Sequence, residues 1–393
     1  MPKHDVDRTL TYLQRSRSAP IDIGVLSLHS PQDLEVFKYL IPHITRTRSL
    51  IVHGHHAEVR AASLLFCTPS PTLQLLEINS TRGSVRLPDD FLGQQAPSLS
   101  SVSFTGVYPA FWSTLPLPSL IEFKLSLPES ADPFHVGALF HFFSGCPWLQ
   151  KIYINSKETP QDVTLDQVIS LESLVELDYA CNLVGRIIPY LRLPRLKRLH
   201  VSSSFGSGQA QKLADFLPHG GHVLLAEATK MLYYSDEQSQ EVRFYGDETL
   251  LSYTAFRTTA DRSPIDWFFD ETCIPFGRIE KLIVGGSVTV DSPINILDFK
   301  NLRIFQMIQW NTSFAEGLLR SLHPHPGGEI PCQSLREIQY TYRGSLRPLV
   351  NLVKERKRAG HQLRLVSLSI IHGSEEDLVE ELKEHVYEVL ITT

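Results

Sequence analysis

The sequence lacks the cysteine pattern of secreted or metal-binding proteins. It has five cysteines among 393 residues, an odd number, and no two of them form a CxxC spacing. Scattered cysteines of this kind predict reduced thiols that pack as small core residues in a cytoplasmic or nuclear protein. They are Cys67, Cys146, Cys181, Cys273 and Cys332.

Long apolar runs and an excess of positive charge are also absent. No apolar stretch reaches the roughly 18 residues of a membrane-spanning helix, and the N-terminus is charged where a secretory signal would be apolar. The formal net charge is −6. An acidic chain has no general attraction for nucleic acid or anionic membranes. We therefore expect neither a membrane nor a nucleic-acid partner.

One eight-residue phrase recurs, with the form Pro-x-apolar-x-x-apolar-x-apolar. PSLIEFKL (118–125), PWLQKIYI (147–154) and PRLKRLHV (194–201) match it fully. Seven further copies begin at residues 71, 97, 172, 277, 300, 333 and, more weakly, at 363. We number the first apolar residue of each copy as position 1; these residues are Leu73, Leu99, Leu120, Leu149, Leu174, Leu196, Ile279, Leu302, Leu335 and Leu365.

The spacing of the copies is typical of leucine-rich repeats. All gaps but one fall between 21 and 33 residues, in or near the period of about 20–29 residues of that architecture. Each copy then predicts a short strand, with positions 4 and 6 in the core and positions 3, 5 and 7 outward on a concave face. The intervening segments 31–44, 135–146, 164–171 and 208–217 carry apolar residues at helical spacing.

The predicted fold is an α/β leucine-rich-repeat solenoid with a parallel concave sheet and irregular repeats. A single solenoid spans 1–393, with a first repeat block over 19–201, a divergent middle section over 202–276, a second block over 277–372 and a capping helix over 373–393. Residues 19–28 form the first strand, and the segment around Leu50–Val52 forms the next.

The middle section is where the phrase disappears. Residues 222–234, 240–246 and 250–256 are expected to be strands there. They are interpreted as degenerate repeats within the solenoid; the alternative is an inserted lobe between two repeat blocks.

The C-terminal segment has a helical pattern. Leu378, Leu382, Val386 and Leu390 are four residues apart, which predicts an amphipathic helix over 375–390 beginning after Gly373-Ser374. We expect it to cap the last repeat.

The segment LTYLQRSRSAPIDI (10–23) resembles a stretch just downstream of the F-box in the large F-box-like leucine-rich-repeat proteins of mushroom-forming (basidiomycete) fungi, in which Pro-x-Leu-x-x-Leu-x-Leu strands follow as they do here. The resemblance implies target recognition for a cullin-based ubiquitin ligase, with the F-box docked on a Skp-type adaptor. No F-box sequence precedes Thr9. Adaptor binding is therefore expected only if an F-box lies upstream of this chain.

Four motifs suggest chemistry, and each has a simpler interpretation. HGHH (53–56) lacks enough further ligands for zinc and suits a surface turn, and HPHPGG (323–328) suits a solvated loop. SSSFGSGQ (202–209) lacks the lysine of a phosphate loop and suits a flexible turn. The basic run KERKRAGHQLR (354–364) suits the solvated face and end of a helix. We expect no metal and no cofactor.

The sequence predicts a non-enzymatic protein-binding module, because no constellation of catalytic residues emerges. The candidate contacts for an unidentified protein target occupy positions 3 and 5 of the middle copies. They are Glu122, Lys124, Lys151, Tyr153, Glu176, Asp178, Arg198 and His200. Ile304, Gln306 and Ile308 suggest a second, more apolar contact zone. An alternative is a structural or decoy scaffold without a link to a ligase.

Overall fold

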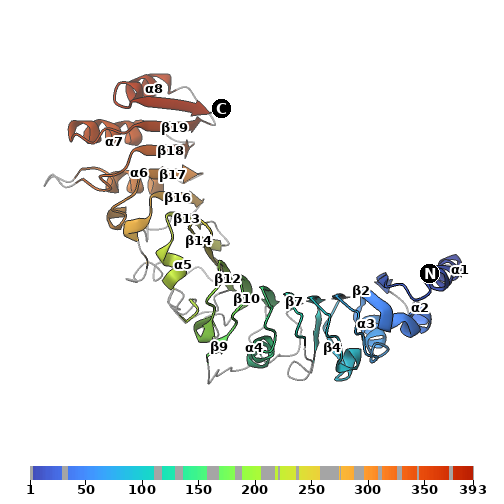
Figure 1. Ribbon diagram of the computed structural model, residues 1–393. Coiled ribbons are helices and arrows are strands. Elements are labelled where there is room, and N and C mark those ends of the chain that lie inside the picture. Colours follow the sequence, from blue (N-terminus) through green and yellow to red (C-terminus); the bar gives the residue numbers. More distant parts are fainter. Residues whose placement is uncertain are drawn as a thin grey trace. The chain divides into compact units, whose positions relative to one another are not determined.

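Figure 1 shows a computed structural model of the protein. It describes residues 3–28, 34–109, 117–128, 136–156, 168–181, 188–204, 217–219, 222–235, 239–256, 274, 276–286, 296–308, 312–324, 330–342, 345–370 and 375–392. The chain forms two compact units: Met1–Leu199 with Asp215–Gly220, and His200–Ala214 with Gly221–Thr393. No helix within these ranges is long and apolar enough to cross a membrane.

The first unit is built on a sheet whose strands follow one another in chain order. They are β1 (Ile21–Leu28), β2 (Thr47–His55), β3 (Leu75–Thr81), β5 (Ser101–Thr105), β7 (Glu122–Leu127), β8 (Lys151–Ser156), β10 (Glu176–Cys181) and β12 (Arg198–Ser204), within which the boundary to the second unit falls. From β1 to β10 all neighbours are parallel. The predicted strands, including 19–28 and the one around Leu50–Val52, are confirmed.

The buried rows of this sheet are those that the phrase predicts. Positions 1, 4 and 6 of all six copies between residues 71 and 201 are buried. An aromatic cluster completes the core behind the strands, because the ring of Phe123 lies 5.0 Å from Phe143 and the ring of Tyr179 lies 6.0 Å from Phe140, centroid to centroid. Both partners come from α4 (Val136–Ser144). The helix thereby packs on the core side of the sheet and leaves its other face, formed by positions 3, 5 and 7, open.

Helices and short strands precede or connect the strands of the main sheet in the first unit. They are α1 (Lys3–Ser16), α2 (Glu35–Leu40), η2 (Ile41–Arg46), α3 (His56–Ser63), η3 (Phe91–Gln94), α4, η5 (Ile188–Tyr190) and the two-stranded pairs β4 (Val85–Leu87) with β6 (Val107–Pro109) and β9 (Ile169–Ser170) with β11 (Leu191–Arg192). The helices predicted within 31–44 and 135–146 are confirmed over the described residues. The helix predicted for 164–171 is wrong at its end, where Ile169 and Ser170 pair with β11. The one predicted for 208–217 lies outside the described residues except for Leu217.

The second unit carries a sheet of mixed direction. Its strands lie in the order β15 (Leu250–Phe256), β14 (Ser239–Tyr245), β13 (Lys230–Ser235), β16 (Lys281–Gly286), β17 (Ile304–Ile308), β18 (Glu337–Tyr342), β19 (Leu365–Ile370) and β20 (Glu388–Thr392). β14 is antiparallel to both of its neighbours. From β13 through β16 to β20 all neighbours are parallel.

The divergent middle section thus contains a three-stranded antiparallel meander that is part of this sheet. The prediction of an entirely parallel sheet is wrong for these three strands. The strands at 240–246 and 250–256 are confirmed. The strand predicted for 222–234 is confirmed only for its second half, because α5 (His222–Ala226) occupies the first. Only three residues separate β13 from β14 in sequence and only four separate β14 from β15, and antiparallel neighbours need no crossover helix.

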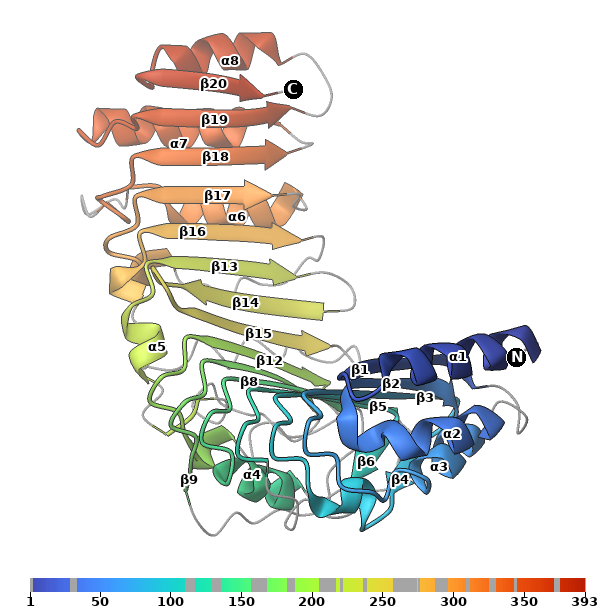
Figure 2. The ribbon, with the colours of Figure 1, turned by 45° about the vertical axis from the view of Figure 1, so that its right-hand side comes forward.

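Helices cover one face of the second sheet. They are η7 (Phe276–Arg278), η8 (Ile296–Asp298), α6 (Thr312–Ser321), α7 (Arg347–Arg358) and α8 (Glu376–Lys383). Figure 2 shows α6 and α7 together behind β16 to β19. The strand residues at positions 3, 5 and 7 are therefore on the face away from these helices.

The C-terminal helix is shorter than predicted. α8 ends at Lys383, and Glu388–Thr392 form β20, which pairs with β19. Leu378, Leu382 and Val386 are buried as expected, but Leu390 is 45% exposed. The consecutive residues Val389, Leu390, Ile391 and Thr392 are mostly β-branched, and they favour a strand once β19 offers a partner.

The predicted register of the last copy, at residues 363–370, is wrong by two residues. Leu365 pairs with Glu337, a position-3 residue, so the buried residues of β19 are Val366 and Leu368, preceded by Leu363. Leu365 itself lies on the open face.

The basic run 354–364 lies on α7 and the turn after it, as expected, with one exception. Lys357 is exposed and donates a hydrogen bond to the carbonyl of Glu384. Arg356, however, is fully buried. Its guanidinium donates to the carbonyls of Leu322, Pro331 and Cys332. A charged side chain therefore supports the loop before β18 from inside the unit.

Candidate functional site

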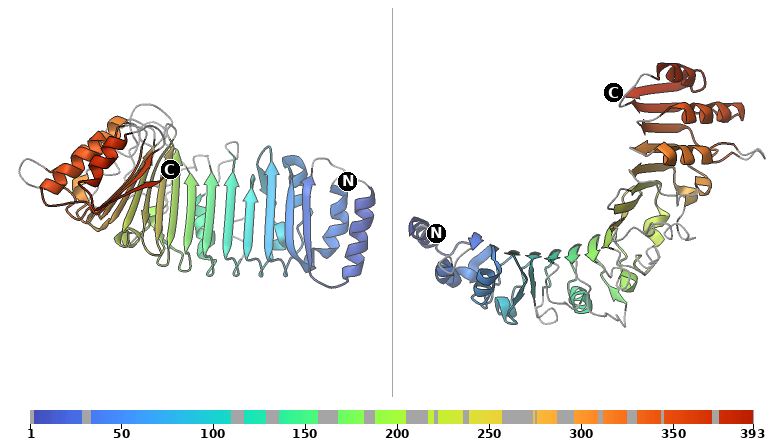
Figure 3. Two further views of the ribbon diagram at one scale, coloured as in Figure 1. Left: turned by 90° about the horizontal axis from the view of Figure 1, so that it is seen from above. Right: turned by 180° about the vertical axis from the view of Figure 1, so that it is seen from behind.

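The candidate site is a charged patch on the open face of the first unit. Its strands β7, β8 and β10 lie side by side in Figure 3. Their register puts Glu122, Lys151 and Glu176 in one row across the sheet. Lys124, Tyr153 and Asp178 form the next row. Because alternate residues of a strand share a face, both rows point to the same side. The spacing of the phrase predicted these two rows.

Tyr153 lies at the centre of the patch. The ammonium of Lys124 is 5.2 Å from the centroid of its ring, within the range of a cation–π contact. Burial, followed by the charge of Glu176 and a hydrogen bond to it, raises the pKa of Tyr153 to about 12. The phenol is therefore a neutral group, held between a cation and a carboxylate.

Two carboxylates of the patch lie near its cations. Lys124 Nζ lies 3.0 Å from Glu122 Oε1, and Arg198 Nη1 lies 3.9 Å from Glu176 Oε2. The cations are the more accessible partners: the side chain of Arg198 is 64% exposed, against 22% for that of Glu176. Lys151 is exposed and forms no ion pair with the part of the chain that the structure describes.

Seven of the eight predicted residues come together. Six occupy the two rows, and Arg198 joins them through Glu176. His200 follows Arg198 in β12 by two residues and is half-buried, but it belongs to the second unit. We therefore define the charged patch as Glu122, Lys124, Lys151, Tyr153, Glu176, Asp178 and Arg198.

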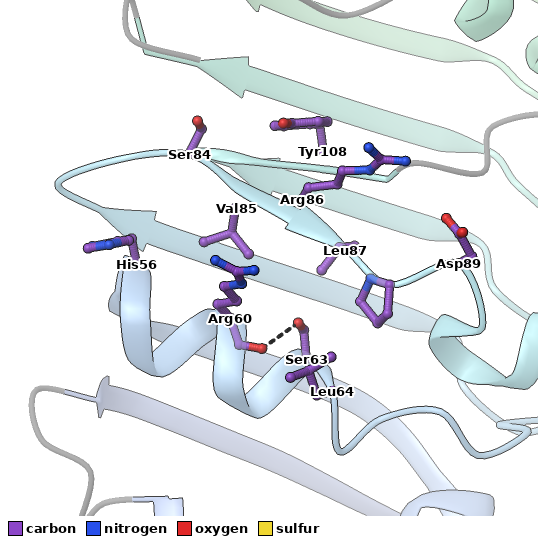
Figure 4. Close-up of a pocket in the computed structure, with 11 residues that line it drawn as sticks. His56, Arg60, Ser63, Leu64, Ser84, Val85, Arg86, Leu87, Asp89 and Tyr108 are labelled. Atoms are coloured by element: carbon purple, nitrogen blue, oxygen red, sulfur yellow. Dashed lines mark hydrogen bonds between the residues drawn. The ribbon is translucent and has the colours of Figure 1, made fainter. Parts of the chain in front are cut away.

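A pocket of about 460 Å³ lies elsewhere in the first unit, between α3 and β4 (Figure 4). Arg60 and Arg86 bring positive charge to its lining, His56 brings an imidazole, and Asp89 brings a carboxylate. Val85 and Leu87 supply apolar surface, with Leu64, Ser63, Ser84, Pro88 and Tyr108 completing the lining. The hydroxyl of Ser63 is engaged, because it donates to the carbonyl of Arg60 at 2.8 Å. The lining suits a small polar group, and none of the predicted site residues takes part.

The histidine motifs are engaged in local contacts. His53 Nε2 lies 2.8 Å from Glu77 Oε1, and His55 Nδ1 lies 3.0 Å from the hydroxyl of Thr81. In the second motif, His323 Nδ1 lies 2.5 Å from Glu355 Oε2. The described ranges contain no group of three or more His, Cys, Asp and Glu side chains that could hold a metal ion. The predicted surface turn at 53–56 is wrong, because α3 follows β2 directly.

The second unit contributes a surface that the sequence revealed only in part. Ile304, Gln306 and Ile308 lie on the open face, as predicted for the apolar zone. Lys281 lies on the same face, at position 3 of its copy of the phrase. The sequence did not predict that Lys230, its register partner in β13, lies beside it. No repeat pattern places Lys230, because its strand lies in the segment without the phrase.

The geometry thus offers two sheet faces with polar and apolar side chains at strand spacing. No known family model matches the sequence, and no curated protein is significantly similar to it.

Proposed function

We propose that the protein is a non-enzymatic binding module whose charged patch holds a protein partner. The observation that carries this proposal is the in-register placement of charges of both signs around Tyr153 on an uncovered sheet face. Tyrosine and arginine are enriched among residues that dominate binding energy, and charge complementarity selects the partner and its orientation. Lys124 and Glu176 hold the ring of Tyr153 in place, so little side-chain entropy is lost on binding.

The resemblance of residues 10–23 supports a more specific role. It favours target recognition for an F-box-type ubiquitin ligase, within a leucine-rich-repeat solenoid. The competing proposal is a structural or decoy scaffold without a ligase.

A pull-down with matched variants tests the binding site. Tyr153→Ala combined with Arg198→Glu should abolish capture of the partner that the wild-type protein retains. The control, Tyr190→Ala with Arg192→Glu, makes the same chemical changes on η5 and β11, where Tyr190 is 42% exposed. Each surface change should cost within about 0.5 kcal/mol of stability, which thermal melting checks. Loss of the partner in the control, with retention in the patch variant, would refute the charged patch as the site.

The ligase role is tested separately. Purified residues 1–393 should not retain a Skp-type adaptor, whereas a fusion with an upstream F-box should. A stoichiometric complex of the adaptor with residues 1–393 alone would show that docking uses another part of the chain. Failure of the fusion to support ubiquitination of the captured partner would favour the scaffold.

A further inference from the structure

Two lysines lie side by side on the open face of the second unit. Lys230 in β13 and Lys281 in β16 are register partners on neighbouring parallel strands. Like charges opposite one another on neighbouring strands destabilise a sheet. Burial and the charge of Lys230 both lower the pKa of Lys281, with Glu337 acting in the opposite direction. Neither lysine forms an ion pair with the residues that the structure describes, so Glu337 offsets their repulsion only through its charge at a longer distance.

An aromatic ring fixes the position of one of these lysines. The ammonium of Lys230 lies 4.6 Å from the centroid of the Tyr245 ring, and Tyr245 is its register partner in β14. Such a contact holds the cation over the sheet without removing its charge.

Apolar side chains adjoin the lysines two residues further along the strands. Leu232 and Ile283 are register partners there, and Ile283 is only 7% exposed. At the next position the ring of Tyr234 lies across Gly285, where an added Cβ would come within 2.9 Å of its Cδ2. Met231 and Tyr233 alternate with these residues in β13 and are buried in the core, and α6 lies behind β16 (Figure 2), so this surface is on the face away from the core. Positive charge and apolar surface thus lie next to each other on one sheet face.

We propose that this surface, formed by Lys230, Lys281, Tyr245, Leu232, Ile283 and Tyr234 and called the lysine face below, binds an acidic segment of another protein. Carboxylates of the segment pair with the two lysines, and an apolar side chain between the carboxylates packs on Leu232, beside the nearly buried Ile283. Charge complementarity identifies this occupant. An acidic partner relieves the repulsion between the lysines, a basic partner increases it, and a neutral apolar partner leaves it in place. The lysine face is distinct from the charged patch and adds a second site.

A selection from a displayed library of random peptides tests the proposal. We expect the wild-type protein to enrich acidic peptides that contain an apolar residue. The most enriched peptide should then bind Lys230→Glu/Lys281→Glu at least about tenfold more weakly in fluorescence anisotropy. The control Lys300→Glu/Arg364→Glu changes the net charge equally at two exposed residues, and Tyr153→Ala/Arg198→Glu changes the charged patch; both should retain binding within about twofold.

Three results would overturn the proposal. The first is enrichment of neutral or basic peptides by the wild-type protein. The second is equal binding of the enriched peptide to the wild type and to Lys230→Glu/Lys281→Glu. The third is binding of single-stranded RNA that is tighter than that of the acidic peptide and is weakened by the same two substitutions.

Thermal melting separates a binding role from a structural one. Lys281→Gln removes a charge that the folded protein disfavours, so the melting temperature should stay the same or rise while peptide binding weakens. A lower melting temperature would show that Lys281 stabilises the fold and would contradict the proposal.

Discussion

Replacement of Arg356 by methionine should lower the free energy of local unfolding around α7 by about 2–4 kcal/mol. The guanidinium is fully buried and donates to the carbonyls of Pro331 at 2.8 Å, Cys332 at 3.0 Å and Leu322 at 3.3 Å. Methionine fills much of the volume but cannot donate a hydrogen bond. The carbonyls of Pro331 and Leu322 then lose this donor, and each buried carbonyl left unpaired costs about 1–3 kcal/mol. The carbonyl of Cys332 keeps the backbone N–H of Leu335 at 2.9 Å.

Removing the buried charge also stabilises the folded variant, so the net loss of stability is smaller than the sum of the costs of the unpaired carbonyls. Burial lowers the pKa of Arg356, which means that the folded protein disfavours its charge. Burial also raises the pKa of Cys332 to about 12, so the thiol beside the guanidinium is neutral and supplies no counter-charge. Removing the guanidinium therefore recovers part of the desolvation energy. Alanine should be worse than methionine, because it also leaves a cavity.

Hydrogen exchange of peptides covering residues 330–335 and 347–358 measures this change, because exchange reports local as well as global opening. Slower exchange or unchanged exchange in the methionine variant would refute the reasoning. It would show that the cost of burying the charge outweighs its hydrogen bonds, as it does for some buried ion pairs.

Three further predictions concern the rest of the chain. Deletion of residues 374–393 removes the buried side chains of Leu378, Val379, Leu382 and Val386, and each contributes about 1.5–3 kcal/mol to stability if fully buried. The truncated protein should melt at lower temperature or aggregate, and an unchanged melting curve would contradict this. Because the pKa of Tyr153 is raised to about 12, the stability that its protonated phenol contributes is complete below about pH 10, the usual tyrosine pKa, and is lost as the pH rises toward 12. Comparison of the phenolate absorbance of the wild type and Tyr153→Phe should show that Tyr153 ionises above the usual range, and ionisation near pH 10 would contradict it. Burial and a contact with Asp90 raise the pKa of Cys67 to about 11. Iodoacetamide should therefore alkylate this thiol slowly near pH 8.5, the usual pKa of a free thiol, and faster in the variant Asp90→Asn. Equal alkylation rates in the wild type and the variant would exclude this role of Asp90.

The repeating phrase was sufficient to predict the charged patch. Its positions 4 and 6 alternate with outward residues, so each copy specifies both a strand and the face of each side chain. Equal phrases also align neighbouring strands, and Glu122, Lys151 and Glu176 share a row for this reason. The expectation that all cysteines are core residues holds for Cys146 and Cys332, whereas Cys67 is partly exposed. Cys273 and the side chain of Cys181 lie outside the described residues.

Errors arose where one pattern fits two structures. In residues 363–370, apolar residues at 363, 365, 366, 368 and 370 accommodate two registers, and only the pairing of Leu365 with Glu337 selects one. Leu390 continues the helical spacing of Leu378, Leu382 and Val386, but it also lies in an apolar strand. Burial of Arg356 depends on carbonyls 24 to 34 residues away in sequence, which no local pattern encodes.

The reversed strand β14 affects the order in which the second unit can fold. In the first unit, neighbouring strands pair residues about one repeat apart, as Lys151 and Glu176 do over 25 residues. β13 and β14 are close in sequence, since Ser235 pairs with Gln240. The other neighbour of β13 is distant in sequence, since Lys230 pairs with Lys281 over 51 residues. Folding therefore cannot proceed strand by strand along the chain.

During synthesis the hairpin can form early, while the edge of β13 that β16 will occupy stays unpaired until β16 has been made. An unpaired strand edge can bind the wrong strand, in the same chain or in another one. During this interval the second unit is therefore exposed to misassembly through the edge of β13.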